Sequence, residues 1–341
     1  MSPVETGVTG GTAVPAQAGQ SAQAGQFTEA GQFTEAAPFT EAGRPASATA
    51  PPDEVLVDGV PIRYAVSGSG NRDLLLVHGY QAHHKWWYRV LPALEERWRV
   101  IRLDLSGHGD SGHRDRYDVD MWISELIAVL DAVGSRHALL AGHSMGGRVA
   151  AVAAASHPDR FGGLVMLDSM LRPAGSPPPR IASLPPGREL VYASREIAAA
   201  RFRLRPPQQE PSAEVVRPIA EYAVRPRANA DGWTWKFDQR GLPPVDNDRV
   251  VQSLARLRMP VWFVRAAHSL VVTDEVAGYA RAVLPAGSTF VTLPGAHHHL
   301  ILDAPDEFLR LLADLHGDLA ASVRLHGGHH GNHHPPFSPS A

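Results

Sequence analysis

The sequence predicts an α/β protein, because short apolar runs typical of buried strands alternate with segments of helical pattern. Residues 73–77 and 137–141 are such apolar runs, 98–104 also looks like a strand, and the alanine-rich stretch 148–155 suits a tightly packed helix. Each of the three runs leads directly into a turn that contains glycine. These turns therefore carry the candidate chemistry.

The turn from Gly142 to Gly146 places Ser144 between small residues, where the apolar run gives way to the helical pattern. The glycines relieve crowding, so the serine can adopt a strained backbone conformation with its hydroxyl exposed. This pattern is typical of a nucleophile elbow.

A second turn, His78-Gly79-Tyr80, follows the run 73–77 and fits an oxyanion loop. Acyl transfer builds negative charge on a carbonyl oxygen, which two fixed backbone N–H groups can stabilise. We expect these donors to be the amides of Tyr80 and Met145, with Gly79 allowing a close approach.

The third turn, Asp104 to Ser111, reads Asp-Leu-Ser-Gly-His-Gly-Asp-Ser and completes a series of three linked motifs. Their order and spacing resemble the α/β-hydrolase superfamily over roughly Val55 to Ala320. The resemblance implies an α/β-hydrolase fold: an eight-stranded, mostly parallel sheet flanked by helices, with a helical cap inserted after strand 6. It does not name a substrate, because one fold supports many chemistries.

Three adjacent histidines, His297 to His299, follow a strand-like run at 289–293. In the resembling family the catalytic histidine stands a fixed distance before an acidic-x-Pro, here Asp303 to Pro305, and this register selects His298. A neutral imidazole there could take the Ser144 proton and return it to the leaving group. Three consecutive loop residues cannot all face one metal ion, so we expect no metal site in this run.

The acid of the triad has two candidates. The loop 266–272, where the resembling family commonly carries it, contains no carboxylate. Asp274 comes later, just after Thr273, and fits the first turn of a helix. Asp168 ends the strand-like run 163–167, a position that some α/β-hydrolases use, and we favour it over Asp274.

The chain divides into five expected regions. They are a disordered low-complexity tail at 1–52 with GQFTEA repeats, a first core part at 53–170, a helical cap at 171–250, a second core part at 251–322, and a disordered His/Pro-rich tail at 323–341. Six side chains are candidates for the substrate pocket: Trp86, Trp87, His143, Trp233, Trp235 and His299.

Composition excludes several classes. The chain has no cysteine, so disulfides and thiolate chemistry are absent, and its net charge of −3 gives no basic stripe for nucleic acid. We find neither a signal peptide nor an apolar run long enough to span a membrane, and expect a soluble, cytoplasmic protein.

The expected function is a serine-dependent hydrolase of a small-molecule ester, thioester, lactone or related carbonyl compound, without metal or organic cofactor. One alternative is a cofactor-independent oxygenase or perhydrolase that uses the same triad. The other is a non-catalytic, ligand-binding member of the fold.

Overall fold

The computed structural model describes residues 52–176, 188–209, 211–228 and 230–326, with the side chains of 316–326 left out. The chain forms two units, Met1–Ala48 and Thr49–Ala341, and everything below concerns the second. The expected N-terminal tail and its repeats, and the histidines at 329–334, lie outside the described residues.

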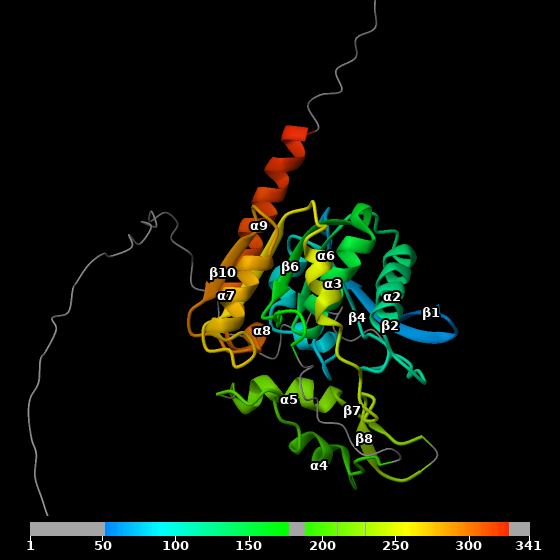
Figure 1. The fold of residues 1–341 in the computed structure, drawn as a ribbon. Coiled ribbons are helices and arrows are strands. Elements are labelled where there is room, and N and C mark those ends of the chain that lie inside the picture. Colours follow the sequence, from blue (N-terminus) through cyan, green and yellow to red (C-terminus); the bar gives the residue numbers. More distant parts are fainter. Residues whose placement is uncertain (1–51, 177–187, 210, 229, 327–341) are drawn as a thin grey trace, which may run out of the picture. The chain divides into compact units, whose positions relative to one another are not determined.

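One eight-stranded sheet forms the centre of this unit (Figure 1). Its strands, in spatial order, are β1 (Asp53–Val57), β2 (Val60–Ser67), β4 (Arg99–Leu103), β3 (Asp73–Val77), β5 (Ala138–His143), β6 (Phe161–Leu167), β9 (Val261–Ala266) and β10 (Thr289–Leu293). The pairs β1–β2 and β2–β4 are antiparallel, and the other pairs are parallel. The predicted α/β-hydrolase sheet is confirmed.

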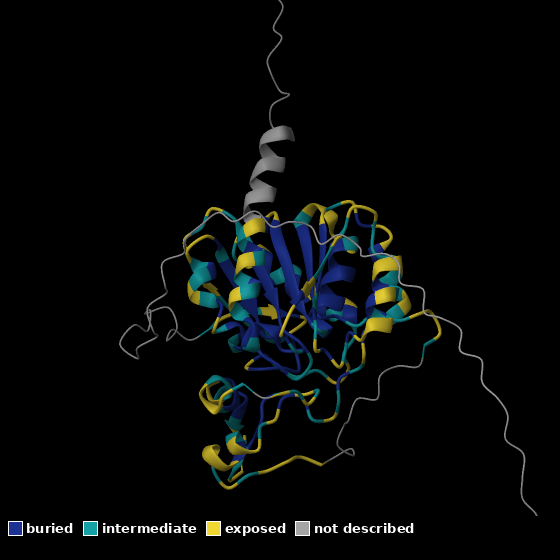
Figure 2. Cartoon of the chain, turned by 90° about the vertical axis from the view of Figure 1, so that its left-hand side faces the viewer, coloured by how far each residue is buried: buried dark blue, intermediate teal, exposed yellow. Residues whose placement is uncertain are grey.

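Helices cover both faces of the sheet, and the buried strands lie between them (Figure 2). One face packs against α2 (Val119–Ala132), α3 (Met145–Ser156), α6 (Asn247–Leu254) and α7 (Asp274–Val283). The other packs against η3 (His84–Trp87), α1 (Leu91–Glu95), α8 (Leu300–Asp303) and α9 (Pro305–His326), while the short η4 (Pro158–Arg160) leads into β6. Residues 74–77 of β3 enter opposite clusters alternately, which explains why all four are apolar.

The cap lies between β6 and α6. It consists of α4 (Arg195–Ala200), α5 (Ala213–Tyr222) and a hairpin of β7 (Val224–Pro226) and β8 (Trp233–Trp235). Ser194 caps α4 by accepting a hydrogen bond from Ile197 N, as its sequence position favours. The expected cap boundary at residue 250 falls inside α6, which packs with α3 in the core.

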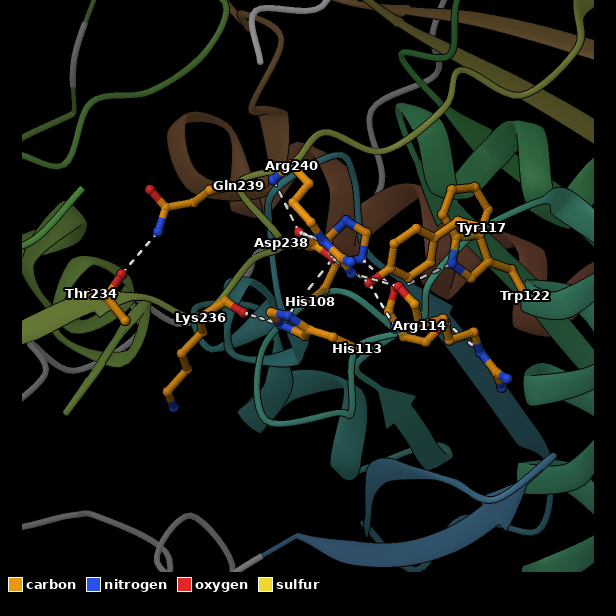
Figure 3. A network of polar contacts seen from close by, with 11 residues as sticks. His108, His113, Arg114, Tyr117, Trp122, Thr234, Lys236, Asp238, Gln239 and Arg240 are labelled. Atoms are coloured by element: carbon orange, nitrogen blue, oxygen red, sulfur yellow. Dashed lines mark hydrogen bonds and ion pairs between the residues drawn. The ribbon is translucent and has the colours of Figure 1, made fainter. Parts of the chain in front are cut away.

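Asp238 fixes the segment that returns from the cap to the core (Figure 3). Its carboxylate accepts a 2.7 Å hydrogen bond from the Tyr117 hydroxyl, and its backbone N–H donates to Gly107 O at 2.8 Å. Burial raises the pKa of this carboxyl, but Arg240 and Tyr117 outweigh burial and hold the pKa at about 2. The return segment is thereby joined to the loop that follows β4.

Among the described residues, no helix combines the length and apolar character needed to cross a membrane.

Candidate active site

Ser144 occupies a sharp turn between β5 and α3, with φ 54° and ψ −115°. A β-carbon added at Gly142 would lie 2.4 Å from the backbone of Gly146, and one added at Gly146 would lie 2.4 Å from His78 O. Both positions therefore require glycine, as predicted for an elbow. The Ser144 N–H donates to Leu167 O at 2.8 Å, which ties the turn to the end of β6.

The two predicted oxyanion donors belong to backbone that runs beside this serine. Met145 is the first residue of α3, so its N–H has no acceptor within the helix. A β-carbon added at Gly79 would lie 3.3 Å from Ser144 Cβ, so the Gly79–Tyr80 turn passes close to the nucleophile candidate.

The side chain of His78 stabilises that turn through two hydrogen bonds. Its Nε2 accepts a hydrogen bond from Leu105 N at 3.1 Å, and its Nδ1 lies 2.8 Å from Gly79 O, to which it can donate. Burial lowers the pKa of His78, which favours the neutral ring that this arrangement needs.

Asp168 and His298 meet although 130 positions separate them in the sequence. His298 Nδ1 donates to Asp168 Oδ2 at 2.7 Å, and both side chains are buried. The same carboxylate accepts Ala266 N at 3.0 Å and the hydroxyl of Ser269. Asp168 has φ 46°, so it too occupies a strained turn at a strand end.

Ser269 is the neighbour of Asp168 that sequence reasoning missed. Its oxygen accepts hydrogen bonds from Val271 N and Val272 N at 3.0 and 2.9 Å, so its proton is free to go to Asp168. The loop 266–272, which lacks the expected carboxylate, thus supplies donors to the carboxylate of the neighbouring strand. A hydroxyl in that loop was the available signal.

Asp274 has a different setting. It opens α7, its side chain is 96% exposed, and it forms a 2.6 Å ion pair with Arg265. Thr273 caps this helix by accepting a hydrogen bond from Val276 N. Both observations confirm the prediction that Asp274 belongs to a helix start.

Three buried histidine rings gather beside the elbow: His143, His298 and His299. The His143 ring lies 4.8 Å from the His298 ring and 5.7 Å from the His299 ring, centroid to centroid, and its Nε2 donates to His298 O at 2.8 Å. Burial, followed by the neighbouring His298, lowers the pKa of His143 to about 3. Burial and then the other two rings likewise lower the pKa of His299 well below 6.5. A hydrogen bond with the Arg205 backbone acts in the opposite direction but does not outweigh them.

The remaining pocket candidates separate into three environments. Trp86 lies 5.0 Å from the His299 ring and 6.1 Å from Phe202 of the cap, between ring centroids. Trp87 is fully buried in the core against Phe308, which leaves Trp86 as the member of this pair that faces His299. Trp233 and Trp235 belong to the apolar cluster of the cap.

A cavity of about 430 Å³ lies within the cap, between α4 and α5. Arg195, Phe202, Arg203 and Arg217 are among its lining residues, and Ser144, Asp168 and His298 are not. It is a groove of the cap and not the site of the candidate chemistry.

The family model for the alpha/beta hydrolase fold matches residues 74–305, which is more than half of the chain. The chain belongs to the α/β-hydrolase family.

Individual relatives match over different lengths. A Pseudomonas putida protein named dihydrolipoyllysine-residue acetyltransferase component of acetoin cleaving system is 38% identical over 120 residues, 35% of this chain and 32% of that protein. The matched segment therefore spans about a third of that relative. A Danio rerio serine hydrolase-like protein is 24% identical over 275 residues, 72% of this chain and 82% of that protein.

Among solved structures, the thioesterase domain from the curacin biosynthetic pathway aligns with a TM-score of 0.64. It shares 22% identity and covers 77% of this chain and 98% of its own. This likeness shows the fold.

Proposed function

We propose that the protein is a serine hydrolase that cleaves a carboxylic ester, thioester or lactone through an acyl-enzyme, with Ser144 as nucleophile. The observation that carries this proposal is the 2.7 Å hydrogen bond from His298 to Asp168, with the His298 ring against His143, the residue that precedes a serine held at φ 54°. A strained elbow serine and an oriented imidazole together make up the machinery of acyl transfer.

His298 would move the proton. Because its Nδ1–H is directed to Asp168, its Nε2 carries a lone pair that can accept the Ser144 proton as Oγ attacks the carbonyl carbon. The imidazolium then protonates the departing alcohol or thiol as the carbon–oxygen or carbon–sulfur bond breaks. Water next attacks the acyl group and gives a proton to the same nitrogen, and Ser144 recovers its own proton as the acid leaves.

Asp168 would hold the His298 tautomer and stabilise the imidazolium without taking its proton. Its carboxylate accepts hydrogen bonds from Ala266, Ser269 and His298, which fix its orientation toward the imidazole. The exposure of Asp274 and its pairing with Arg265 support Asp168 as the acid.

The amides of Tyr80 and Met145 would hold the developing oxyanion. Loss of one such donor typically costs about a hundred- to a thousandfold in rate. Support comes from the position of Met145 at the start of α3 and from the close approach of Gly79 to Ser144.

Aromatic side chains favour an apolar acyl group. Trp86 lies between His299 and Phe202 of the cap, so a chain leaving the acyl carbon on that side would meet aromatic faces. The cap also contacts the loop that carries His297 to His299, since Gln208 Oε1 accepts a hydrogen bond from His299 N at 3.1 Å.

A series of aryl esters with increasing acyl length tests the proposal. We expect turnover by the native chain, and losses of at least about a thousandfold in Ser144→Ala and Asp168→Asn. Asp274→Asn is the matched control, and its turnover should stay close to native. The proposal would be overturned if Asp274→Asn lost as much turnover as Ser144→Ala. It would also be overturned if the native chain hydrolysed esters poorly while it consumed oxygen or peroxide with a suitable substrate.

A further inference from the structure

We propose that His143, His298 and His299 form a binding site for a divalent transition-metal ion, with Zn²⁺ as the probe, and that the bound ion inhibits the enzyme. The site itself depends only on the three rings. The inhibition rests on the proposed function, because it requires His298 to be the general base.

The three rings are close enough to share an ion. One nitrogen from each lies within 4.8 Å of the others, and the residues are 2%, 3% and 3% exposed. A tetrahedral Zn²⁺ with bonds of about 2.0–2.1 Å places its ligand nitrogens roughly 3.4 Å apart. Movements of about 1 Å by the side chains would therefore bring the three nitrogens to the distances that Zn²⁺ needs. The run 297–299 could not serve one ion, but here His143 replaces His297.

The hydrogen bonds of two rings already have the form that metal-binding histidines adopt. A ligating histidine usually donates its second ring N–H to a carboxylate or a backbone carbonyl, which fixes its tautomer. His298 donates Nδ1–H to Asp168, and His143 donates Nε2–H to the carbonyl of His298. The remaining nitrogen of each ring carries a lone pair.

His299 supplies the independent sign of a ligand. One of its ring nitrogens has the Arg205 backbone as its only neighbour for a hydrogen bond among the described residues, and the other has no partner there, although the ring is buried. Burying an imidazole nitrogen without a partner costs free energy. A metal ion shared with His143 and His298 would satisfy one of these nitrogens.

The donor set selects the class of ion. Three imidazole nitrogens suit Zn²⁺, Co²⁺, Ni²⁺ and Cu²⁺, whereas Mg²⁺ and Ca²⁺ prefer oxygen ligands. A nitrogen of His298 that binds Zn²⁺ has no lone pair left for the Ser144 proton. The ion therefore competes with catalysis.

The test uses the full-length chain with the five C-terminal histidines changed to glutamine, so that they do not compete for metal. We call this variant the background chain. The five histidines are His326, His329, His330, His333 and His334. Calorimetric titration with Zn²⁺ should give one site per chain. His299→Gln should weaken that site at least about tenfold, whereas His137→Gln, an exposed histidine just before β5, should leave it unchanged.

Two further measurements separate ligand loss from misfolding and from failure of the proposed function. Co²⁺ should give the visible absorption of a tetrahedral complex with the background chain. With His299→Gln the absorption should be weaker, while the circular dichroism spectrum of the protein should stay the same. Ser144→Ala should bind Zn²⁺ like the background chain while lacking turnover.

Ester hydrolysis by the background chain should fall with added Zn²⁺ and return with a chelator, and His299→Gln should need at least about tenfold more Zn²⁺. Absence of a single Zn²⁺ site, equal affinity in His299→Gln, or turnover that rises with Zn²⁺ would overturn the inference. Zn²⁺ binding in a chain without esterase activity would instead refute the proposed function and leave the metal site standing.

Discussion

Two aspartates follow directly after strands of the same sheet, and each has a buried histidine beside it. Asp168 follows β6 and accepts a hydrogen bond from His298 at 2.7 Å, whereas Asp104 follows β4 and lies 3.0 Å from Nδ1 of His84. All four side chains are almost fully buried. The two pairs share their chemistry and their place at strand ends, but differ in what surrounds them.

Asp104 holds parts of the chain together. Its carboxylate accepts His84 N at 2.6 Å and Asp110 N at 2.9 Å, and the hydroxyl of Tyr222 from the cap lies 3.5 Å away. That hydroxyl also donates to Asp110, at 2.6 Å. Burial raises the pKa of Asp104, but His84 and the other nearby histidines outweigh burial and keep the pKa well below its usual value. Asp104 thus joins the β4 loop, η3 and the cap.

Asp168 instead holds a ring that lies against His143. Beyond His298 lies His143, the residue before Ser144, whereas beyond His84 lies the ring of Tyr222 at 5.2 Å. Under the proposed function, the Asp168 pair is catalytic and the Asp104 pair is structural, although both are buried aspartate–histidine pairs. The proposed roles then follow from the group on the far side of each imidazole, which is His143 for His298 and Tyr222 for His84.

Removal of one charge from each pair should separate the two aspartates most clearly. Asp168→Asn should lower kcat/KM by about a thousand- to ten-thousandfold, because the amide no longer favours the correct His298 tautomer. Asp104→Asn should lower it less than about tenfold at a temperature where the variant is folded. Initial rates with an aryl ester measure both, and comparable losses would show that the two pairs are not distinct.

Stability should show the opposite order. Asp104→Asn should lower the free energy of unfolding by about 3 kcal/mol, because it disturbs a buried charge with several partners. Asp110→Asn, whose side chain is 35% exposed, is the matched control and should cost about 1 kcal/mol or less. Urea unfolding gives both values. A smaller loss for Asp104→Asn than for Asp110→Asn contradicts the assigned role.

Acid should destabilise the protein in two separate steps. Burial is the first cause of a lowered pKa at five buried histidines: His78, His83, His108, His143 and His299. Protonation therefore favours the unfolded chain, so the stability these rings contribute is complete above pH 6.5 and is lost as the pH falls below that value. His143 alone, with a pKa of about 3 in the folded chain, contributes about 2 kcal/mol to the loss at pH 5.

The Asp104 contribution follows the same linkage, because its pKa is also lowered in the folded chain, but it survives to lower pH. Its depressed pKa means that its share is lost only as the pH falls below about 4. Urea unfolding at about pH 7.5 and about pH 5 tests the histidine step. Equal stability at the two values would contradict it.

The smallest expected effect concerns Ser269. Ser269→Ala removes one hydrogen bond to Asp168 and should lower kcat/KM about tenfold, equivalent to about 1.4 kcal/mol. Ser269→Thr, which keeps the hydroxyl, should restore most of the rate. If Ser269 acts by positioning Asp168, the acidic limb of the kcat/KM profile against pH should shift in Ser269→Ala and return in Ser269→Thr. An unshifted profile would assign Ser269 a structural part alone.

The sheet was predictable because the parallel strands are buried on both faces and so read as continuous apolar runs. The elbow was predictable for a different reason. At Gly142 and Gly146 only a glycine fits, so steric necessity appears directly in the sequence. The start of α7 was visible for a local reason too, since Thr273 caps the helix within three residues of itself.

The contacts that span the chain were not predictable in this way. The Ser269 hydroxyl meets a carboxylate 101 positions away, and Tyr222 reaches Asp110 across 112 positions. Local propensity carries no information about such pairs, which depend on how the strands are ordered in the sheet. The same applies to His143, which joins two histidines of the C-terminal loop only because β5 ends beside that loop.

The most direct test of the account is covalent labelling by a fluorophosphonate, followed by peptide mass spectrometry. The native chain should carry one adduct, on Ser144, and Asp104→Asn should be labelled at a rate within about tenfold of native. Asp168→Asn should be labelled at least about a hundredfold more slowly, because the base is no longer oriented. An unlabelled Ser144 in the native chain, or equal labelling of the two asparagine variants, would contradict the account.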